Sequence, residues 1–363
     1  MKIAKVESIP LKIPYQFGGR PTVGWALDTL SLSILMVRVE TEEGLVGWGE
    51  AFSYNCLGSV QAMVDQTIAP LAVGRDARDI TGVSRDLQQR LHLFGRYGVT
   101  LFGLSGLDIA LWDIAAKAAG VSLATLFGGA SRTEIPAYAS LLKYAEPPLV
   151  GEKCRAALDE GYGAVKLHET GEAEVRAARE AMGDGVPLCV DTNCPWTPNE
   201  ARQMVDAFRP YDVYWLEEPV FPPEDFESLA KLNLDMPIAA GENACTAFQF
   251  QHMIDVGAVT YAQPSVTKVG GITEFRKIES IAETAGVSVM PHSPYFGPGW
   301  LATLQLASAS AIPNWVERFY CDMEASLYGE YIDVKGGRVV VPQGPGLGCE
   351  PNPDVIKEYW VRD

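Results

Sequence analysis

Between residues 135 and 317 the chain alternates short apolar runs with longer amphipathic segments. The short runs have the length of buried strands, and the longer segments repeat their apolar positions with the period of a helix. A strict succession of strand and helix predicts a parallel (β/α) barrel. The expected strands are residues 135–140, 164–168, 188–191, 213–217, 238–242, 259–265, 287–291 and 315–317. The helices expected between them include residues 172–182, 200–208, 273–285 and 300–308.

The first part of the chain has a different pattern. Residues 3–13 and 32–50 alternate polar and apolar positions, with a turn at 41–44, which predicts an edge strand and an antiparallel hairpin. Residues 59–127 then become helical. The glycines and aromatic residues of segment 17–25 are typical of a loop that folds over a ligand, although an ordinary surface loop has the same composition.

We therefore expect an α/β protein with an N-terminal α+β capping domain at residues 1–128 and a barrel at 129–320. The length of 363 residues suits this arrangement, because a (β/α) barrel takes about 250 residues. Residues 321–363 contain several Gly and Pro and do not continue the alternation. They are expected to pack back on the capping domain.

Three of the expected strands end in an acid at nearly equal spacing. Asp191, Glu217 and Glu242 are separated by 217 − 191 = 26 and 242 − 217 = 25 residues, about the length of one strand and one returning helix. Parallel neighbours would bring the three carboxylates to the same end of the sheet. A single acid at a strand end usually faces solvent, but three in register favour a divalent cation. Hard oxygen ligands without Cys or His favour Mg²⁺ over zinc.

Composition narrows the class of protein. A hydrophobic content of 47% with 21% charged residues is ordinary for a soluble enzyme, and the net charge of −17 argues against nucleic acid as a partner. Seven cysteines without a C-x-x-C pair fit a reducing cytoplasm. No run approaches 18 apolar residues, and the N-terminus alternates like a strand, so we expect a cytoplasmic protein without a membrane partner.

The capping domain, the barrel and the three acids together resemble the enolase superfamily, more closely its mandelate racemase and muconate lactonizing branch. The resemblance covers essentially the whole chain. It rests on residues 107–113 with Lys117 and Gly120, and on 126–129, 217–219, 241–242, 268–271 and 291–292. It implies a barrel of the modified TIM type, Mg²⁺ held by the three acids, a small carboxylate substrate and a homo-oligomer, commonly a dimer or octamer.

Lys166 and His168 end the second expected barrel strand and project to the same face, because side chains on a strand alternate. The family usually carries Lys-x-Lys here. Its second lysine is a base, and its first lowers the pKa of that base and contacts the substrate carboxylate. His168 stands in the place of the second lysine. An imidazole titrates near neutrality, so it can accept a proton from carbon, although a lone histidine is more often structural.

His292 ends the seventh expected strand, and the resemblance places it on the other side of the substrate. Relatives commonly support this histidine with an Asp at the end of the sixth strand, where Ser265 stands here. A serine adds no negative charge, so we expect His292 to be a weak base that donates a proton to a leaving group. The alternative is that it only hydrogen-bonds the substrate. Counting in twos from Ser265 turns Lys268 outward unless a bulge intervenes, so Lys268 is expected to be structural.

Further residues complete the expected pocket. Glu317, at the end of the eighth strand, is where relatives hydrogen-bond the second carboxylate oxygen of the substrate, which would require a protonated or proton-sharing carboxyl group. Asn193, two residues beyond Asp191, is expected to contact the substrate, as are Arg20, Trp25 and Tyr295. The other aromatic residues expected at the pocket wall are Phe17, Trp196, Phe296 and Trp300.

The chemistry that the resemblance implies is removal of the proton α to a carboxylate, with His168 as base and Lys166 and Glu317 near the carboxylate. If a β-hydroxyl then leaves with a proton from His292, a hydroxy acid or sugar acid becomes a 2-keto acid, and we favour this dehydration. Racemisation, epimerisation or cycloisomerisation would share the enolate intermediate. A two-base exchange is less natural without the Asp partner. A catalytically silent binding protein would not require these acids and bases to coexist.

Overall fold

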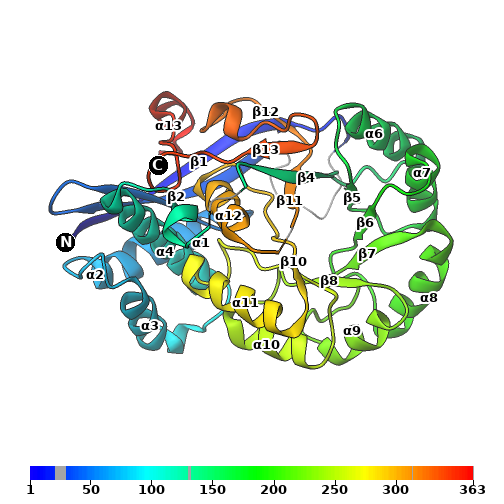
Figure 1. Cartoon of the computed structure of the whole chain (residues 1–363), viewed down its shortest axis with the longest axis horizontal. Helices are drawn as coiled ribbons and strands as arrows, with labels where there is room; N and C mark the ends of the chain where they lie inside the picture. Colours follow the sequence, from blue (N-terminus) through cyan, green and yellow to red (C-terminus); the bar gives the residue numbers. More distant parts are fainter. Residues whose placement is uncertain (21–29, 130–131, 313, 363) are drawn as a thin grey trace.

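The computed structural model describes residues 1–20, 30–129, 132–312 and 314–362. Two sheets organise this part of the chain (Figure 1). One is antiparallel, with strand order β12-β1-β2-β3, and belongs to the N-terminal part together with a short C-terminal strand. The other is parallel, in the order β10-β9-β8-β7-β6-β5-β4-β11, and curls into a barrel with helices outside. The expected α/β fold, a modified TIM barrel with an N-terminal capping domain, is confirmed.

The antiparallel sheet contains β1 (Ile3–Gln16), β2 (Ser31–Thr41) and β3 (Val46–Ala51), close to the predicted strands. The turn between β2 and β3 closes through the bond from Thr41 N to Leu45 O, 2.9 Å. β1 is not an edge strand throughout, because β12 (Asp322–Met323) pairs with Tyr15 and Gln16. The helical elements that follow are α1 (Leu57–Ala62), η1 (Met63–Ile68), α2 (Ala69–Ala72), α3 (Ile80–Arg90), η2 (His92–Phe94), α4 (Val99–Ala119) and α5 (Leu123–Leu126).

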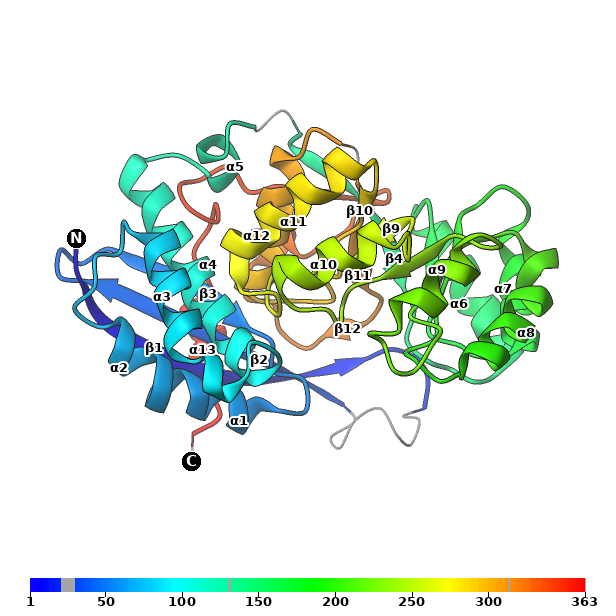
Figure 2. The same cartoon turned by 90° about the horizontal axis from the view of Figure 1, so that it is seen from below.

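The helix α4 is the buried centre of the capping domain. A Cβ atom on Gly49 of β3 would lie 1.9 Å from the carbonyl oxygen of Gly106, so only glycine lets the strand and the helix approach this closely. α4 is long and apolar enough to cross a membrane, but 78% of its most apolar window is buried. Packing against β3 and against the barrel helix α11 (Gly271–Ala285) accounts for its composition (Figure 2).

The barrel strands lie where the alternation predicts them. They are β4 (Glu134–Ser140), β5 (Val165–Leu167), β6 (Leu188–Asp191), β7 (Val213–Glu217), β8 (Ile238–Ala240), β9 (Tyr261–Ala262), β10 (Ser288–Val289) and β11 (Val316–Phe319). The outer helices are α6 (Pro147–Asp159), α7 (Glu172–Met182), α8 (Pro198–Phe208), α9 (Phe226–Asn233), α10 (Thr246–Asp255), α11 and α12 (Pro298–Ala309), with a 3-10 turn η3 (Arg209–Tyr211) after α8. β8, β9 and β10 end two or more residues before the predicted ends, because the chain leaves the sheet there to form the loops above it.

The seam between β10 and β11 is joined above the sheet by Ser293. Its Oγ accepts a hydrogen bond from Glu317 N, 2.9 Å, and its own N–H donates to the carboxylate of Glu317, 3.2 Å. Aromatic and small side chains fill the barrel interior, among them Tyr138 and Trp215, whose rings meet edge to face at 5.6 Å. The polar side chains at the strand ends therefore lie directly above a tightly packed, mostly apolar barrel interior.

The C-terminal segment touches both parts of the molecule. β12 extends the antiparallel sheet, and after α13 (Pro353–Tyr359) the chain bonds to β1 from Val361 N to Pro10 O, 2.9 Å. Between them lie η4 (Gly329–Tyr331) and β13 (Arg338–Val340), and β13 pairs antiparallel with the barrel strand β4. The predicted boundaries after residues 128 and 320 stay a prediction.

Candidate active site

A pocket of about 450 Å³ lies between the C-terminal ends of the barrel strands and the capping domain. The barrel side supplies its acids and bases, and the capping side supplies mostly aromatic rings. The barrel residues are His168, Asp191, Asn193, Glu242, Asn243, Lys268, His292, Pro294, Glu317 and Phe319. The capping residues are Phe52, Tyr54, Asn55 and Phe102.

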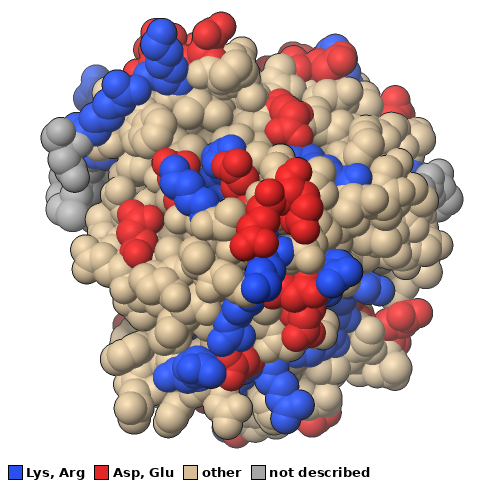
Figure 3. Space-filling view, turned by 90° about the vertical axis from the view of Figure 1, so that its left-hand side faces the viewer, with Lys and Arg blue, Asp and Glu red and all other residues tan. Residues whose placement is uncertain are grey.

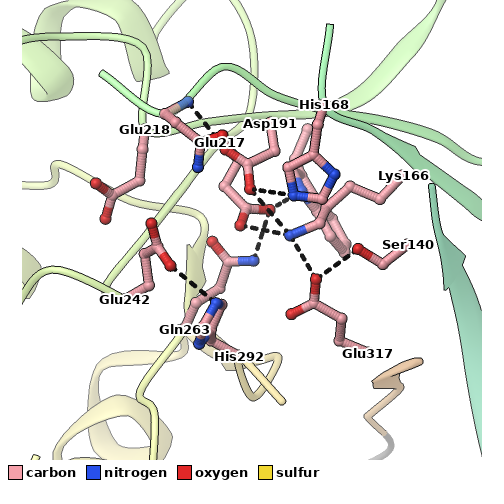
Figure 4. A network of polar contacts seen from close by, with 12 residues as sticks. Ser140, Lys166, His168, Asp191, Glu217, Glu218, Glu242, Gln263, His292 and Glu317 are labelled. Carbon is pink, nitrogen blue, oxygen red and sulfur yellow. Dashed lines mark hydrogen bonds and ion pairs between the residues drawn. The ribbon is translucent and has the colours of Figure 1, made fainter. Parts of the chain in front are cut away.

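Lys166 lies at the centre of the buried charges (Figure 4). Its Nζ is 3.1 Å from Asp191 Oδ2 and 2.8 Å from both Glu217 Oε1 and Glu317 Oε1. Burial alone would lower the pKa of Lys166, but the carboxylates of Glu217, Glu317 and Asp191 outweigh it and raise that pKa well above its ordinary value. Lys166 is therefore a fixed cation and not a base.

Glu217 is held from two sides within the sheet. Its Oε2 accepts hydrogen bonds from Trp215 Nε1, 3.0 Å, and from Gln263 Nε2, 2.8 Å. Burial and then the neighbouring charge of Asp191 raise the pKa of Glu217, whereas Lys166 and His168 overcome burial and lower the pKa of Asp191. The two acids are close enough that negative charge on one opposes charge on the other.

Glu242 lies apart from this pair and turns toward His292, with 2.8 Å between its Oε2 and His292 Nε2. Within the described residues no three His, Cys, Asp or Glu side chains converge on one point as they stand. The donor set nevertheless fits Mg²⁺. It consists of buried carboxylates without thiolate: the three acids at 191, 217 and 317 share one buried ammonium at 166, and Glu242 pairs with His292.

His168 reaches the pocket from the end of β5. Its Nδ1 is 2.5 Å from the carbonyl oxygen of Leu141, which can only accept, so Nδ1 carries a hydrogen and Nε2 is left as the acceptor of the neutral ring. Nε2 points toward the strand ends, 3.3 Å from Asp191 Oδ2. Once protonated, the His168 ring would have the carboxylate of Asp191 beside it, and Lys166 holds that carboxylate in place. The arrangement therefore suits a base.

His292 reaches the pocket from the other side, as Figure 4 shows. Its Nε2 donates to the carboxylate of Glu242 at 2.8 Å, and its Nδ1 is 3.2 Å from Tyr295 Oη. Ser265 does not touch the ring directly. Its Oγ hydrogen-bonds the same Tyr295 hydroxyl, so the tyrosine stands between the serine and the histidine.

Glu317 is hydrogen-bonded on both carboxylate oxygens, and the expectation that it shares a proton with a bound substrate stays a prediction. It accepts hydrogen bonds from Lys166, from Ser140 Oγ at 2.7 Å and from Ser293 N. Burial raises its pKa, but Lys166 and His292 outweigh burial and lower it overall. In this arrangement Glu317 is an ionised acceptor that fixes Lys166.

Backbone conformation shapes the loops after β6 and β7. Asn193, Cys194 and Glu218 have positive φ angles of 53°, 57° and 46°, which non-glycine residues rarely adopt. Asn193 lines the pocket, and its backbone N–H donates to Asp191 Oδ1 at 3.0 Å. Glu218 turns away from the pocket and accepts from Asn243 Nδ2 at 2.7 Å, so it supports the loop after β8.

Several predicted pocket residues lie elsewhere. Arg20 is exposed and is not among the described residues that line the pocket, and Trp25 lies outside the described residues. Tyr295 is only 2% exposed and stands behind His292 instead of on the pocket wall. Phe296 and Trp300 belong to the core, and Phe17 packs on Tyr144.

Lys268 lines the pocket, so the expectation that it faces outward is wrong. The chain leaves β9 after Ala262 and turns through residues 265–269, so the two-residue alternation of a strand no longer applies. The Nζ of Lys268 lies 4.7 Å from the ring centroid of Phe52. Phe52 and Tyr54 follow β3 directly, and only their position after the hairpin could have marked them.

Two family models match the chain. Residues 149–355 match the model described as enolase C-terminal domain-like, and residues 21–128 match the N-terminal domain of mandelate racemase / muconate lactonizing enzyme. The two matches fall on the barrel and the capping domain.

Proteins of known name are similar over nearly the whole chain. It is 32% identical to arabinonate dehydratase of Saccharolobus solfataricus, over 91% of each chain. It is 31% identical to D-galactarolactone cycloisomerase of Agrobacterium fabrum, over 91% of this chain and 92% of that protein. A crystal structure of L-talarate dehydratase from Polaromonas sp., complexed with Mg and L-glucarate, has a TM-score of 0.86 and 31% identity, covering 99% and 98% of the two chains.

Proposed function

Because the chain belongs to the mandelate racemase and muconate lactonizing enzyme family of the enolase superfamily, we propose that it dehydrates a hydroxy acid or sugar acid to a 2-keto acid with Mg²⁺ as cofactor. The observation that carries this proposal is the pair of imidazoles at the pocket. His168 Nδ1–H is held by the Leu141 carbonyl, so Nε2 of the neutral ring can take up a proton with the Asp191 carboxylate 3.3 Å away, whereas His292 Nε2 donates to the carboxylate of Glu242 at 2.8 Å. One ring is suited to take a proton and the other to give one.

The first step is removal of the α-proton by His168. Asp191, Glu217 and Glu242 would hold Mg²⁺, which would supply positive charge near the substrate carboxylate. Lys166, fixed by Glu317, adds a second positive centre that needs no reorganisation during the reaction. The imidazolium formed at His168 lies 3.3 Å from Asp191, so its new charge is stabilised.

The second step is loss of the β-hydroxyl group. His292 transfers the proton of Nε2 to the departing oxygen, which leaves as water, and the electrons of the enolic intermediate form the new carbon–carbon double bond. The resulting enol tautomerises to the 2-keto acid. Aromatic residues of the capping domain exclude water from this side of the pocket, with Phe52 and Phe102 flanking Lys268.

Cycloisomerisation is the second candidate, because a similar protein of comparable identity is named D-galactarolactone cycloisomerase. It would use the same proton removal by His168. Its product keeps all atoms of the substrate, so the fate of the β-oxygen separates the two reactions.

The direct test is incubation of the enzyme with Mg²⁺ and a panel of aldonic and aldaric acids that begins with arabinonate, talarate and glucarate. The 2-keto acid product is followed as its semicarbazone. We expect keto acid from at least one acid in the presence of Mg²⁺ and none after chelation with EDTA. An isomer of the substrate as the sole product would contradict dehydration and favour the second candidate.

We further propose that the protein acts in the cytoplasm as a homo-oligomer, a dimer or octamer, on a small carboxylate. Seven free thiols fit a reducing compartment. A net charge of −17 disfavours nucleic acid as a partner. On the face drawn in Figure 3 acidic and basic side chains are interleaved, and neither sign forms a broad patch.

A further inference from the structure

Tyr295 is a buried residue placed between His292 and the end of the sixth barrel strand. Its hydroxyl oxygen is 3.2 Å from His292 Nδ1, and the two rings meet edge to face with 5.9 Å between centroids. The same hydroxyl hydrogen-bonds Ser265 Oγ, and Ser265 is fully buried. Ser265 stands where the family resemblance predicts an aspartate, so the tyrosine occupies the space between the histidine and a side chain too short to reach it.

The role proposed for His292 determines which atom donates and which accepts in the hydrogen bonds of Tyr295 with His292 and with Ser265. A histidine that gives up the proton of Nε2 and ends as a neutral ring must keep its other hydrogen on Nδ1. The partner of Nδ1 must then accept a hydrogen bond. Tyr295 Oη can accept from Nδ1 only if its own hydrogen is directed elsewhere, and Ser265 Oγ is the acceptor in contact with it. Burial raises the pKa of Tyr295, so the phenol stays neutral and keeps this hydrogen.

We infer that Tyr295 is a positioning residue for the proton donor: its hydroxyl group accepts Nδ1–H of His292 and donates to Ser265, so that Nε2 carries the proton that is transferred. This inference rests on the proposed dehydration. It gives Ser265 a task as acceptor of the tyrosine hydrogen, with Thr267 Oγ1 a further 3.4 Å from Ser265 Oγ. It also removes Tyr295 from the substrate contacts, because its hydroxyl group is engaged by His292 and Ser265 and the residue is not among those that line the pocket.

Replacing Tyr295 by Phe tests the inference, since it deletes the hydroxyl group and keeps the ring. We expect kcat for dehydration to fall by about 10- to 100-fold, the usual effect of losing a partner that orients a functional histidine. KM should change by less than about twofold if the hydroxyl group makes no contact with substrate. Exchange of the α-proton in D₂O should persist, because His168 does not depend on Tyr295.

A substrate analogue with fluorine in place of the β-hydroxyl group separates proton donation from a general structural effect. Fluoride leaves with little help from an acid, so Tyr295→Phe should slow fluoride release by less than about threefold. Ser265→Ala, which deletes the hydroxyl group that accepts from Tyr295, should slow dehydration in the same direction and spare fluoride release. Tyr328→Phe is the matched control, because Tyr328 is also buried and its hydroxyl group has no hydrogen-bond partner among the described residues.

The outcomes are distinguishable. Wild-type-like dehydration by Tyr295→Phe, an equal loss on both substrates, or a raised KM with unchanged kcat would each overturn the positioning role and leave the proposed function standing. A wild-type enzyme that forms no keto acid from any acid tested and releases no fluoride would overturn the proposed function, and this inference with it.

Discussion

At the scale of single residues, the site is organised by what each polar atom can donate or accept. The Leu141 carbonyl fixes one hydrogen on His168, and three carboxylates keep Lys166 charged. Glu242 accepts a hydrogen bond from Nε2 of His292. Positive and negative groups are buried together, where their interactions are much stronger than in water. The roles of base, fixed cation and acid therefore belong to different side chains.

Replacing His168 by Asn tests the base. We expect both α-proton exchange and dehydration to fall by about 10²- to 10⁴-fold, since both need the same proton to be removed. Exchange is measured by NMR in D₂O and keto acid by its semicarbazone. His252→Asn is the control, because His252 is 54% exposed in its side chain and lies on α10. Normal exchange in the His168 variant would assign the base to another residue.

Residue types and spacing predicted that the acids, both histidines and Lys166 lie at or next to strand ends, because the strands follow a regular repeat, and their roles stay a prediction. The predicted positions of the Tyr295 and Lys268 side chains were wrong for the same physical reason. Both lie in loops after β9 and β10, where the chain turns and no periodicity tells which way a side chain points. The contact between Glu317 and Lys166 could not be predicted either, since it depends on the distance between side chains of two strands that both flank β4.

At the scale of secondary structure elements, the capping domain is attached to the barrel through a helix start. Glu50, the penultimate residue of β3, is 2% exposed and accepts a hydrogen bond from Gly299 N, 2.8 Å, in the first turn of α12. A Cβ on Gly297 would lie 2.6 Å from this carboxylate, so the helix begins with glycines there. Phe52 and Tyr54 follow Glu50, and this contact therefore sets the aromatic side of the pocket.

The pH dependence of stability tests this contact. Burial raises the pKa of Glu50 to about 8, although the backbone N–H groups of Gly299 and Gly297 oppose the rise. A carboxyl whose folded pKa exceeds its unfolded pKa of 4.5 supports folding fully below 4.5, and that support is lost as pH rises toward about 8. As pH rises from 5 to 8, we expect the free energy of unfolding to fall less for Glu50→Gln than for the wild type.

Urea unfolding at several pH values measures the effect. The difference between Glu50→Gln and the wild type should shift by about 1 kcal/mol or more across this range, since one pKa unit corresponds to about 1.4 kcal/mol. Glu180→Gln, on the exposed face of α7, should follow the wild-type profile. Parallel profiles for Glu50→Gln and the wild type would show that Glu50 is ionised in the folded protein throughout.

At the scale of the whole molecule, two parts enclose one pocket. We propose that residues 1–128 supply the apolar wall of the pocket and that residues 129–320 supply its acids and bases. Residues 321–363 then form a segment that packs against both parts. The barrel could be predicted from the alternation of strands and helices, and the capping sheet from its polar and apolar alternation. The course of the C-terminal segment could not, because β12 and β13 are two and three residues long and pair with different sheets.

Magnesium binding should stabilise the whole molecule, because the buried carboxylates outnumber the cations that pair with them. A ligand that binds only the folded state at 100 times its Kd adds about 2.7 kcal/mol, so we expect a rise of several degrees in Tm with Mg²⁺. NaCl at equal ionic strength controls for screening of the net charge of −17. Asp191→Asn should lose the Mg²⁺-dependent part, and an equal rise with NaCl would contradict a specific site.

In the mechanism that we propose, His168 takes the α-proton and His292 gives a proton to the leaving hydroxyl group. The test is to incubate a hydroxy acid that is a substrate with Mg²⁺ in D₂O, with the wild type and with His292→Asn. NMR then identifies the products and the deuterium content of the remaining substrate. We expect keto acid from the wild type, and from the variant an intact substrate that has gained deuterium at the α-carbon with retained configuration. Loss of both reactions in the variant, or inverted α-deuterated acid from the wild type, would contradict it.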